Sequence, residues 1–386
     1  MRPYSVALGQ RRLAVAQFYV PKVLDMPDCQ PLYPASIQRQ TIGLVSSDRG
    51  VVLSIQYLRG LAAMAVAVSH IAGHPGLTCA TGAAGVDVFF VISGFIMWTV
   101  TSQRPVKPGS FIIDRLTRVA PPYMLLTIAI YLIVNYVPGG FPNMRTNLSH
   151  MILSVLFIPH TDPYGRGFPL VVPGWTLTYE IFFYTLFAVG LLAPVRRRAW
   201  ICTAVFSILV GAGLLTYSDN EAVNTYTNPL LMEFVAGLWL GVAWNAQKLP
   251  CKKWGGIAFF AGIAGLAAWE MLSGTQPLGL RALVWGLPAT LIVVGLLTIE
   301  QRVRLVRSRF LLLLGNSSYS IYLVNVFVVA ATWRVMNRAP ILVYFVTAIV
   351  ISIVGGVIFW QIVERPITRL ARHRFHRPTV TGSALT

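Results

Sequence analysis

The stretch LSIQYLRGLAAMAVAVSHIAG, from Leu53 to Gly73, decides the class of this chain. It is long and apolar enough to span a bilayer, yet it contains Arg59 and His70, and ionisable groups inside a span are costly and usually functional. About 16 Å, close to three helical turns, separates the two side chains, so they share one helix face at different depths. The pair predicts a polar pathway with a cation at one depth and a proton acceptor at another. A snorkelling arginine and a histidine satisfied in the core are the alternative.

The composition places the whole chain in the membrane. Of its 386 residues 55% are hydrophobic and 11% charged, and the mean hydropathy is +0.65. No soluble domain of this size needs so much apolar surface. The formal charge of +18 comes from short basic clusters between apolar runs, a pattern that marks membrane topology rather than nucleic-acid binding. The four cysteines are scattered, which indicates neither a disulfide framework nor a metal site.

Apolar windows of about 19 residues predict an all-α polytopic membrane protein with about ten transmembrane helices. The predicted spans are 53–73, 84–102, 119–137, 175–194, 199–217, 228–246, 254–272, 281–299, 316–334 and 340–363. The apolar run 150–159 is too short to span, so we expect it at the interface or as a re-entrant segment.

Basic residues gather after every second predicted span. They are Arg104, Lys107, Arg115 and Arg118; Arg196, Arg197 and Arg198; Lys248, Lys252 and Lys253; Arg302, Arg304, Arg307 and Arg309; and Arg365, Arg369, Arg372, Arg374 and Arg377 in the tail. The opposite loops hold only Arg145, Arg166, Arg281, Arg334 and Arg338. By the positive-inside rule, both termini lie in the cytoplasm.

Three regions follow from these patterns. Residues 1–50 are rich in proline and contain no apolar run long enough for a signal peptide or a span, which predicts a disordered cytoplasmic extension or a reading frame begun too early. Residues 51–370 are expected to form the membrane domain, and residues 371–386 a basic cytoplasmic tail.

The predicted topology sorts the intramembrane charges by depth. Asp87, Glu180, Glu233 and Glu270 fall with His70 in the outer half, whereas arginines crowd the inner side. Such groups must face one another or a wet cavity, because lipid does not solvate them. The sorting predicts an anionic ligand that enters from the cytoplasm and a hydroxyl-rich ligand that approaches from outside.

His70 is the candidate base, since imidazole takes and returns a proton near neutral pH. A neighbouring carboxylate would orient its ring; Glu180 is the first choice and Asp87 the second. For Asp87 a helix-capping role is the alternative, and for Glu233 a packing hydrogen bond. In SFIIDRLTRVAPPY, Arg115 and Arg118 are three residues apart and could grip phosphates from one helix face, although topology alone would also place arginines there.

Several segments in a fixed order resemble the bacterial integral-membrane acyltransferases called acyltransferase 3. They are the Arg59-x10-His70 arrangement, GVDVFFVISGF (85–95), FIIDRLTRVAPPY (111–123), the stretch from Trp175 to Glu180, NSSYSIYLVN (316–325) and VERP (363–366). The resemblance covers about residues 53–370. The opening SIQYLRGLAA resembles the branch that O-acetylates exopolysaccharides such as succinoglycan. The chain has Asn325 where many relatives have a histidine, which leaves hydrogen bonding as its expected role.

The resemblance implies an O-acyltransferase of the bacterial inner membrane. It would move an acyl group, most often acetyl, from a cytoplasmic coenzyme A thioester to a hydroxyl of a polysaccharide or lipid-linked sugar outside, without a metal. Arg115 and Arg118 would bind the coenzyme phosphates, and Arg59 the thioester end or pantetheine chain. His70 would deprotonate the acceptor or carry the acyl group. Trp175, Asn325 and Glu233 are expected to contact substrate.

Other functions remain open from the sequence. A transporter or flippase for a polyol or lipid-linked saccharide would also have many spans and buried charges, but would leave its substrate unmodified. A non-catalytic component of a polysaccharide export complex fits less well, because a histidine stands at the matching place. Within the enzyme class, the acceptor could instead be peptidoglycan or the sugar of an antibiotic.

Overall fold

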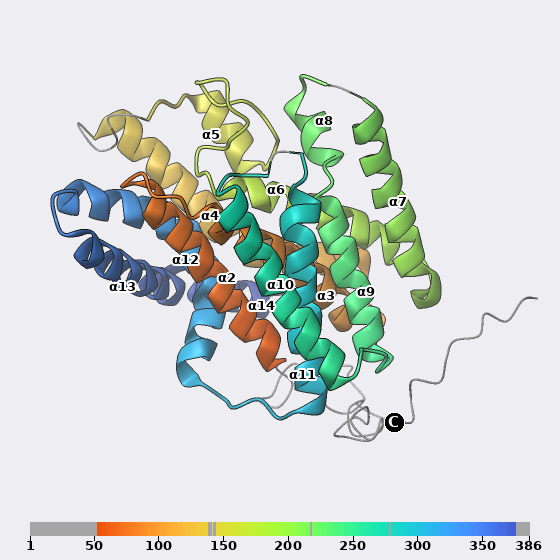
Figure 1. Ribbon diagram of the computed structural model, residues 1–386. Coiled ribbons are helices and arrows are strands. Elements are labelled where there is room, and N and C mark those ends of the chain that lie inside the picture. Colours follow the sequence, from red (N-terminus) through yellow and green to blue (C-terminus); the bar gives the residue numbers. More distant parts are fainter. Residues whose placement is uncertain (1–51, 138–140, 142–143, 217, 278, 376–386) are drawn as a thin grey trace, which may run out of the picture.

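The computed structural model describes residues 52–375, apart from 138–140, 142–143, 217 and 278 (Figure 1). The predicted extension of residues 1–50 and most of the predicted tail, from 376 onward, lie outside the described residues.

Every regular element of the described part is a helix, as the hydropathy pattern predicts. In chain order they are α2 (Leu53–Gly73), η2 (Ala80–Ala84), α3 (Gly85–Thr101), α4 (Pro108–Tyr136), α5 (Leu148–Val155), α6 (Gly174–Gly190), α7 (Val195–Leu215), α8 (Glu221–Tyr226), α9 (Leu231–Asn245), α10 (Lys252–Leu272), η3 (Ala282–Gly286), α11 (Leu287–Arg302), α12 (Arg309–Met336), α13 (Ile341–Phe359), η4 (Trp360–Glu364) and α14 (Arg365–Phe375). The segments η3 and η4 are π-helical turns that continue into α11 and α14.

Eight helices of the described part are long and apolar enough to cross a membrane, so the chain is an all-α polytopic membrane protein. The other two predicted spans, 175–194 and 228–246, correspond to shorter helices: α6 has 17 residues and α9 has 15. Prolines limit both, since α6 follows Pro173 and its chain turns before Pro194, and α9 follows Pro229. The run predicted as interfacial contains the short helix α5.

Close helix pairs build the bundle: α2 packs along α12, and α3 along α9. Glycines allow the second contact. A Cβ on Gly237 would lie 1.8 Å from the carbonyl oxygen of Val91, and one on Gly94 would lie 2.0 Å from that of Phe234. Small residues commonly permit such contacts between membrane helices, where backbones must approach closely.

The ends of the bundle differ. At one end lie α5 and α8, and at the opposite end lies the link between α11 and α12 (Figure 1). A carboxylate fixes the start of α2: Glu300 accepts hydrogen bonds from the backbone N–H groups of Leu53, at 2.8 Å, and Ser54, at 2.9 Å. A negative charge in this position satisfies free amides and complements the helix dipole.

Candidate active site

A cavity of about 750 Å³ lies between α2, α3, α4, α6 and α12. Its polar lining includes Arg59 of α2, Arg115 and Arg118 of α4, and Glu180 of α6. Four residues predicted as functional from separate parts of the sequence thus meet at one site. Along α3 the lining extends from Val86 to Met97, a distance of about 16 Å, so the cavity is elongated.

The three cavity arginines have no acidic partner at ion-pair distance among the described residues, whose ion pairs are Arg166–Asp162 and Arg281–Asp87. Within the described part of the chain, Arg59 donates only to the side chain of Gln56, at 3.2 Å. The Nε of Arg115 is buried and receives no partner from the described chain, while its guanidinium lies 5.8 Å from the ring of Phe111.

Two carboxylates lie near these arginines. Glu180 accepts hydrogen bonds from the hydroxyl groups of Tyr184 and Ser93. Glu364, in η4, accepts from Ser320 at 2.6 Å, and its charge acts on Arg118 and Arg59. The charged groups that line the cavity are three guanidinium groups and one carboxylate, that of Glu180, so the lining has a positive excess that an anionic ligand could neutralise.

The sequence reasoning missed Glu364, which it noted only as part of the VERP segment. The available signal was an acid directly after a predicted apolar span, where an unpaired carboxylate is costly.

A hydrogen bond between helices fixes the turn of α4 that carries the arginines: Tyr319 of α12 donates to the carbonyl oxygen of Val119, at 2.7 Å.

His70 lies beside Asn325, with 2.5 Å between Nδ1 and the amide oxygen. The amide nitrogen of Asn325 donates to the carbonyl oxygen of Tyr322, at 2.6 Å, which fixes the orientation of the amide. Nδ1 therefore carries the hydrogen, and Nε2 keeps its lone pair. No described residue forms a hydrogen bond to Nε2, so His70 has the form that a base requires.

The predicted pairing of His70 with Glu180 or Asp87 is not present among the described residues. Glu180 binds Tyr184 and Ser93, and Asp87 binds Arg281. The physical reason is lateral packing: α12 lies along α2 and brings Asn325 to the histidine. Asn325 thus stands where a carboxylate was expected.

His70 and the arginines lie toward opposite ends of the site. Tyr322 lines the cavity, and Asn325 follows one turn further along α12, in the direction away from Arg59. The hydroxyl of Tyr322 lies 3.0 Å from that of Thr176, which joins α12 to the first turn of α6. The cavity therefore connects the depth of the arginines with the neighbourhood of the histidine.

A second charged cluster surrounds Asp87. Its carboxylate is fully buried and binds Arg281 through two contacts of 2.8 Å and 3.1 Å. Glu233 lies with its carboxyl group beside that of Asp87 and has only 3% of its surface exposed. Asp87 and Glu233, predicted as catalytic and substrate-binding, thus form a separate cluster. Arg281, counted from the sequence only as a loop base, is its cation.

Trp175 lies at the edge of this cluster. The guanidinium of Arg281 is 5.4 Å from the Trp175 ring and 4.8 Å from the Trp285 ring. Trp175 also meets Tyr179 and Phe90, with ring centroids 5.8 Å and 6.4 Å away. Since Phe90 lines the cavity, Trp175 contacts the wall of the site from outside it.

Comparisons with known proteins support one family. The profile of the acyltransferase domain matches residues 52–361. The chain is 36% identical to the exopolysaccharide production protein ExoZ of Rhizobium meliloti over 82% of this chain and 98% of that protein. It is 25% identical to the acyltransferase MdmB of Streptomyces mycarofaciens, over 85% and 94%. It is 28% identical to the peptidoglycan O-acetyltransferase OatA of Listeria monocytogenes, over 52% and 35%. No solved structure matches the chain.

Proposed function

Because the chain belongs to the acyltransferase 3 family and is a membrane acyltransferase, we propose that it moves an acetyl group from coenzyme A to a hydroxyl of an exopolysaccharide or of its lipid-linked precursor. The single observation that carries this proposal is a cavity lined by three arginines that have no ion-pair partner among the described residues, with His70 and Asn325 one helical turn beyond Tyr322 of its lining.

The arginines are suited to the phosphates of an acyl-coenzyme A. Guanidinium groups bind phosphate oxygens through paired hydrogen bonds, and they stay charged in a desolvated site. Arg115 and Arg118, one turn apart on α4, would hold the phosphates, and Arg59 the pantetheine arm. Glu180, which lies with these arginines, has the role of fixing Tyr184 and balancing their charge rather than that of orienting the histidine.

His70 would act on the acceptor hydroxyl. In the direct route, Nε2 takes the hydroxyl proton, the acceptor oxygen bonds to the thioester carbonyl carbon, the carbon–sulfur bond breaks, and the thiolate of coenzyme A leaves and receives the proton. In the relay route, Nε2 bonds to the carbonyl carbon, the carbon–sulfur bond breaks and the thiolate of coenzyme A leaves; the acceptor oxygen then bonds to the same carbon, the carbon–nitrogen bond breaks, and the hydroxyl proton passes to the thiolate. Asn325 would hold the ring in place in both.

The acceptor follows from the relatives. ExoZ, which this chain matches over nearly its whole length, is named for exopolysaccharide production, and OatA for O-acetylation of peptidoglycan. A saccharide hydroxyl is therefore the proposed acceptor, with peptidoglycan as the second candidate. Family membership favours acyl transfer over the transporter alternative. We place the protein in the bacterial inner membrane with both termini in the cytoplasm, on the distribution of its basic residues.

The test is mass spectrometry of exopolysaccharide from a strain that lacks the gene and carries a plasmid copy. The wild-type copy is expected to restore O-acetyl groups, and His70→Gln is expected to lose them. His74→Gln is the matched control, because His74 lies one turn further on and stacks on Trp333, outside the cavity. Acetylation by the His70→Gln protein at the wild-type level would overturn the assignment.

A further inference from the structure

A second hollow, of about 660 Å³, lies at the end of the bundle that carries α5 and α8. We call it the outer cleft. Its walls are the loop from Phe157 to Pro169, the first turns of α6, and α8.

The lining of the outer cleft is polar and almost uncharged. It combines the rings of Trp175, Tyr179 and His160 with the side chains of Asn224, Thr225 and Glu221. Aromatic rings present flat apolar faces, while amides and hydroxyls both donate and accept hydrogen bonds. A sugar needs this mixture, because its ring has apolar C–H faces and a rim of hydroxyls. A polyphosphate would need cations instead.

Two polar groups of the cleft lack partners. The Nε2 atom of His160 is buried and unpaired within the described chain. The side-chain amide of Asn224 is exposed and makes no hydrogen bond to any described residue, although the backbone N–H of Asn224 donates to the carbonyl oxygen of Asn220. A buried unpaired group such as Nε2 of His160 costs free energy unless a ligand satisfies it, whereas the exposed amide of Asn224 is open to a ligand.

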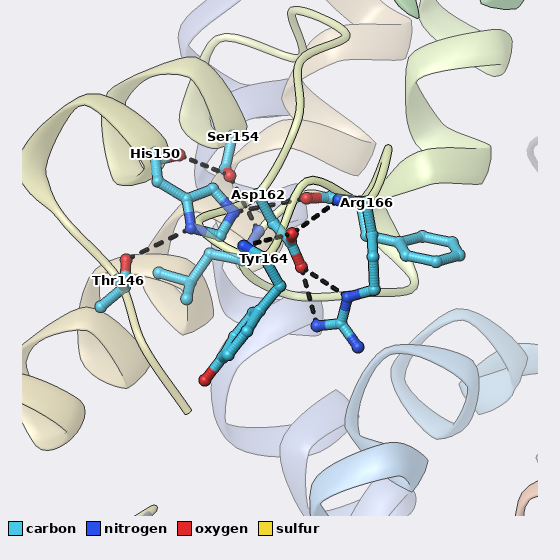
Figure 2. A network of polar contacts seen from close by, with 8 residues as sticks. Thr146, His150, Ser154, Asp162, Tyr164 and Arg166 are labelled. Atoms are coloured by element: carbon cyan, nitrogen blue, oxygen red, sulfur yellow. Dashed lines mark hydrogen bonds and ion pairs between the residues drawn. The ribbon is translucent and has the colours of Figure 1, made fainter. Parts of the chain in front are cut away.

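The loop wall of the outer cleft is held in place by its own hydrogen bonds (Figure 2). Ser154 accepts from the backbone N–H of Leu170 at 2.9 Å, and Nε2 of His150 lies 3.3 Å from the carbonyl oxygen of Phe168. Asp162 accepts from the backbone N–H groups of Tyr164 and Arg166 and from the Arg166 guanidinium. A wall fixed before binding lowers the entropy lost when a ligand binds.

Helix α6 separates the outer cleft from the arginine cavity. Trp175, Thr178 and Tyr179 line the cleft, whereas Thr176, Leu177 and Glu180 line the cavity. The spacing of each set puts it on its own face of one helix. A ligand in the cleft therefore lies one helix width from the cavity. It also lies next to the first turn of α6, where Thr176 contacts Tyr322, and Tyr322 in turn contacts Asn325, the partner of His70.

On these grounds we propose that the outer cleft binds the saccharide acceptor through sugar units other than the one that is acylated, whose hydroxyl must reach Nε2 of His70. The role of this saccharide as acceptor rests on the proposed function, whereas the binding of a saccharide to the cleft can be measured without acyl transfer.

The test uses oligosaccharides from the exopolysaccharide of a strain that lacks the gene, and the purified full-length protein in detergent. The variants are Asn224→Ala, His160→Phe and their combination; Asn337→Ala, an exposed residue beyond α12, is the matched control. Binding is measured by calorimetry without donor. Transfer is then measured with varied oligosaccharide and with varied acetyl-coenzyme A.

Each single variant is expected to weaken oligosaccharide binding and raise the acceptor KM by about threefold to tenfold, the usual effect of one lost hydrogen bond, with kcat and the donor KM unchanged. The Asn337→Ala protein should match wild type. Because Asn224 is exposed, its variant tests the cleft even where His160→Phe perturbs the loop. Unchanged binding and acceptor KM in the combined variant would overturn the cleft while leaving the proposed function intact. If the wild-type protein shows no acyl transfer but binds the oligosaccharide, and the variants lose this binding, the proposed function would be overturned and the cleft would stand.

Discussion

Two groups of buried charges in this bundle differ in how their charge is balanced. Around Asp87, one carboxylate and one guanidinium meet at 2.8 Å, and tryptophan rings cover the cation. In the cavity, Arg59, Arg115 and Arg118 have no such partner among the described residues. A membrane interior tolerates a charge only when something compensates it. The ion pair of Asp87 and Arg281 is therefore balanced without a ligand, whereas the arginine cavity is suited to receive one.

The largest effect is expected from breaking the ion pair of Asp87 and Arg281. In Arg281→Met, Asp87 stays buried without its cation and beside Glu233, a change that typically costs about 3–5 kcal/mol. The thermal midpoint in detergent is expected to fall by the order of 10 °C. The double variant Arg281→Met with Asp87→Asn removes both charges and should recover part of the loss. A single variant as stable as wild type would contradict the structural role of the pair.

The opposite pattern is expected from the cavity. Arg115→Gln with Arg118→Gln should leave the thermal midpoint unchanged or raised, because it removes buried like charges, and should raise the KM for acetyl-coenzyme A by about 10–100-fold, as lost charge-assisted hydrogen bonds predict. Arg304→Gln, an exposed arginine in a neighbouring link, is the control. If the double variant were unstable but kept its donor KM, the cavity arginines would be structural.

A smaller effect is expected at Asn325, which acts through His70 as a positioning residue. Asn325→Ala frees the imidazole to rotate, so kcat should fall by about tenfold while both KM values stay near wild type. Asn325→Gln, which keeps an amide, should restore part of the rate. Equal rates for the alanine variant and wild type would show that the 2.5 Å contact has no part in the reaction.

The smallest expected effect concerns a pair outside the membrane, Asp162 and Arg166. Burial by itself raises the pKa of Asp162, but the hydrogen bonds from Arg166 and Tyr164 outweigh it and hold the pKa below its ordinary value of 3.8. A lowered folded pKa means that the contribution is present above the ordinary value and is lost as the pH falls through the lowered one.

Since the Arg166 side chain is 62% exposed, Asp162→Asn should cost about 1 kcal/mol or less, seen as hydrogen exchange up to about fivefold faster at the amides of Tyr164 and Arg166 near pH 7. The difference between variant and wild type should vanish in strong acid. A difference that persists there would mean that the carboxylate charge is not what orders the loop.

Much of the fold follows from hydropathy, because each span must satisfy its own backbone and cover its own length of bilayer. Accordingly, the described residues form a helix at each of the ten predicted places. Helices α6 and α9 are shorter than predicted because prolines and a buried position, not bilayer thickness, set their ends. The sequence placed Arg59, Arg115 and Arg118 together on the inner side, since depths can be counted along the chain, but it placed Glu180 with His70 in the outer half, whereas Glu180 lines the cavity with the arginines.

The partners of the buried charges did not follow from the sequence. Depth places His70, Asp87, Glu180 and Glu233 at similar levels, but depth does not say which helices are neighbours. The packing of α12 along α2 places Asn325 beside His70. Arg281, directly before the π-helical turn that leads into α11, pairs with Asp87. Arg281 and Glu364 both lie at span ends, where a charge usually indicates topology alone.

Helix α6 has an evolutionary consequence. Its neighbouring residues alternate between two hollows, so Trp175, Thr178 and Tyr179 can vary without altering the surface made by Thr176, Leu177 and Glu180. Substitutions at the first three positions could adapt such a protein to a new saccharide while the opposite face keeps the same donor. One short helix would thus let the two specificities diversify independently.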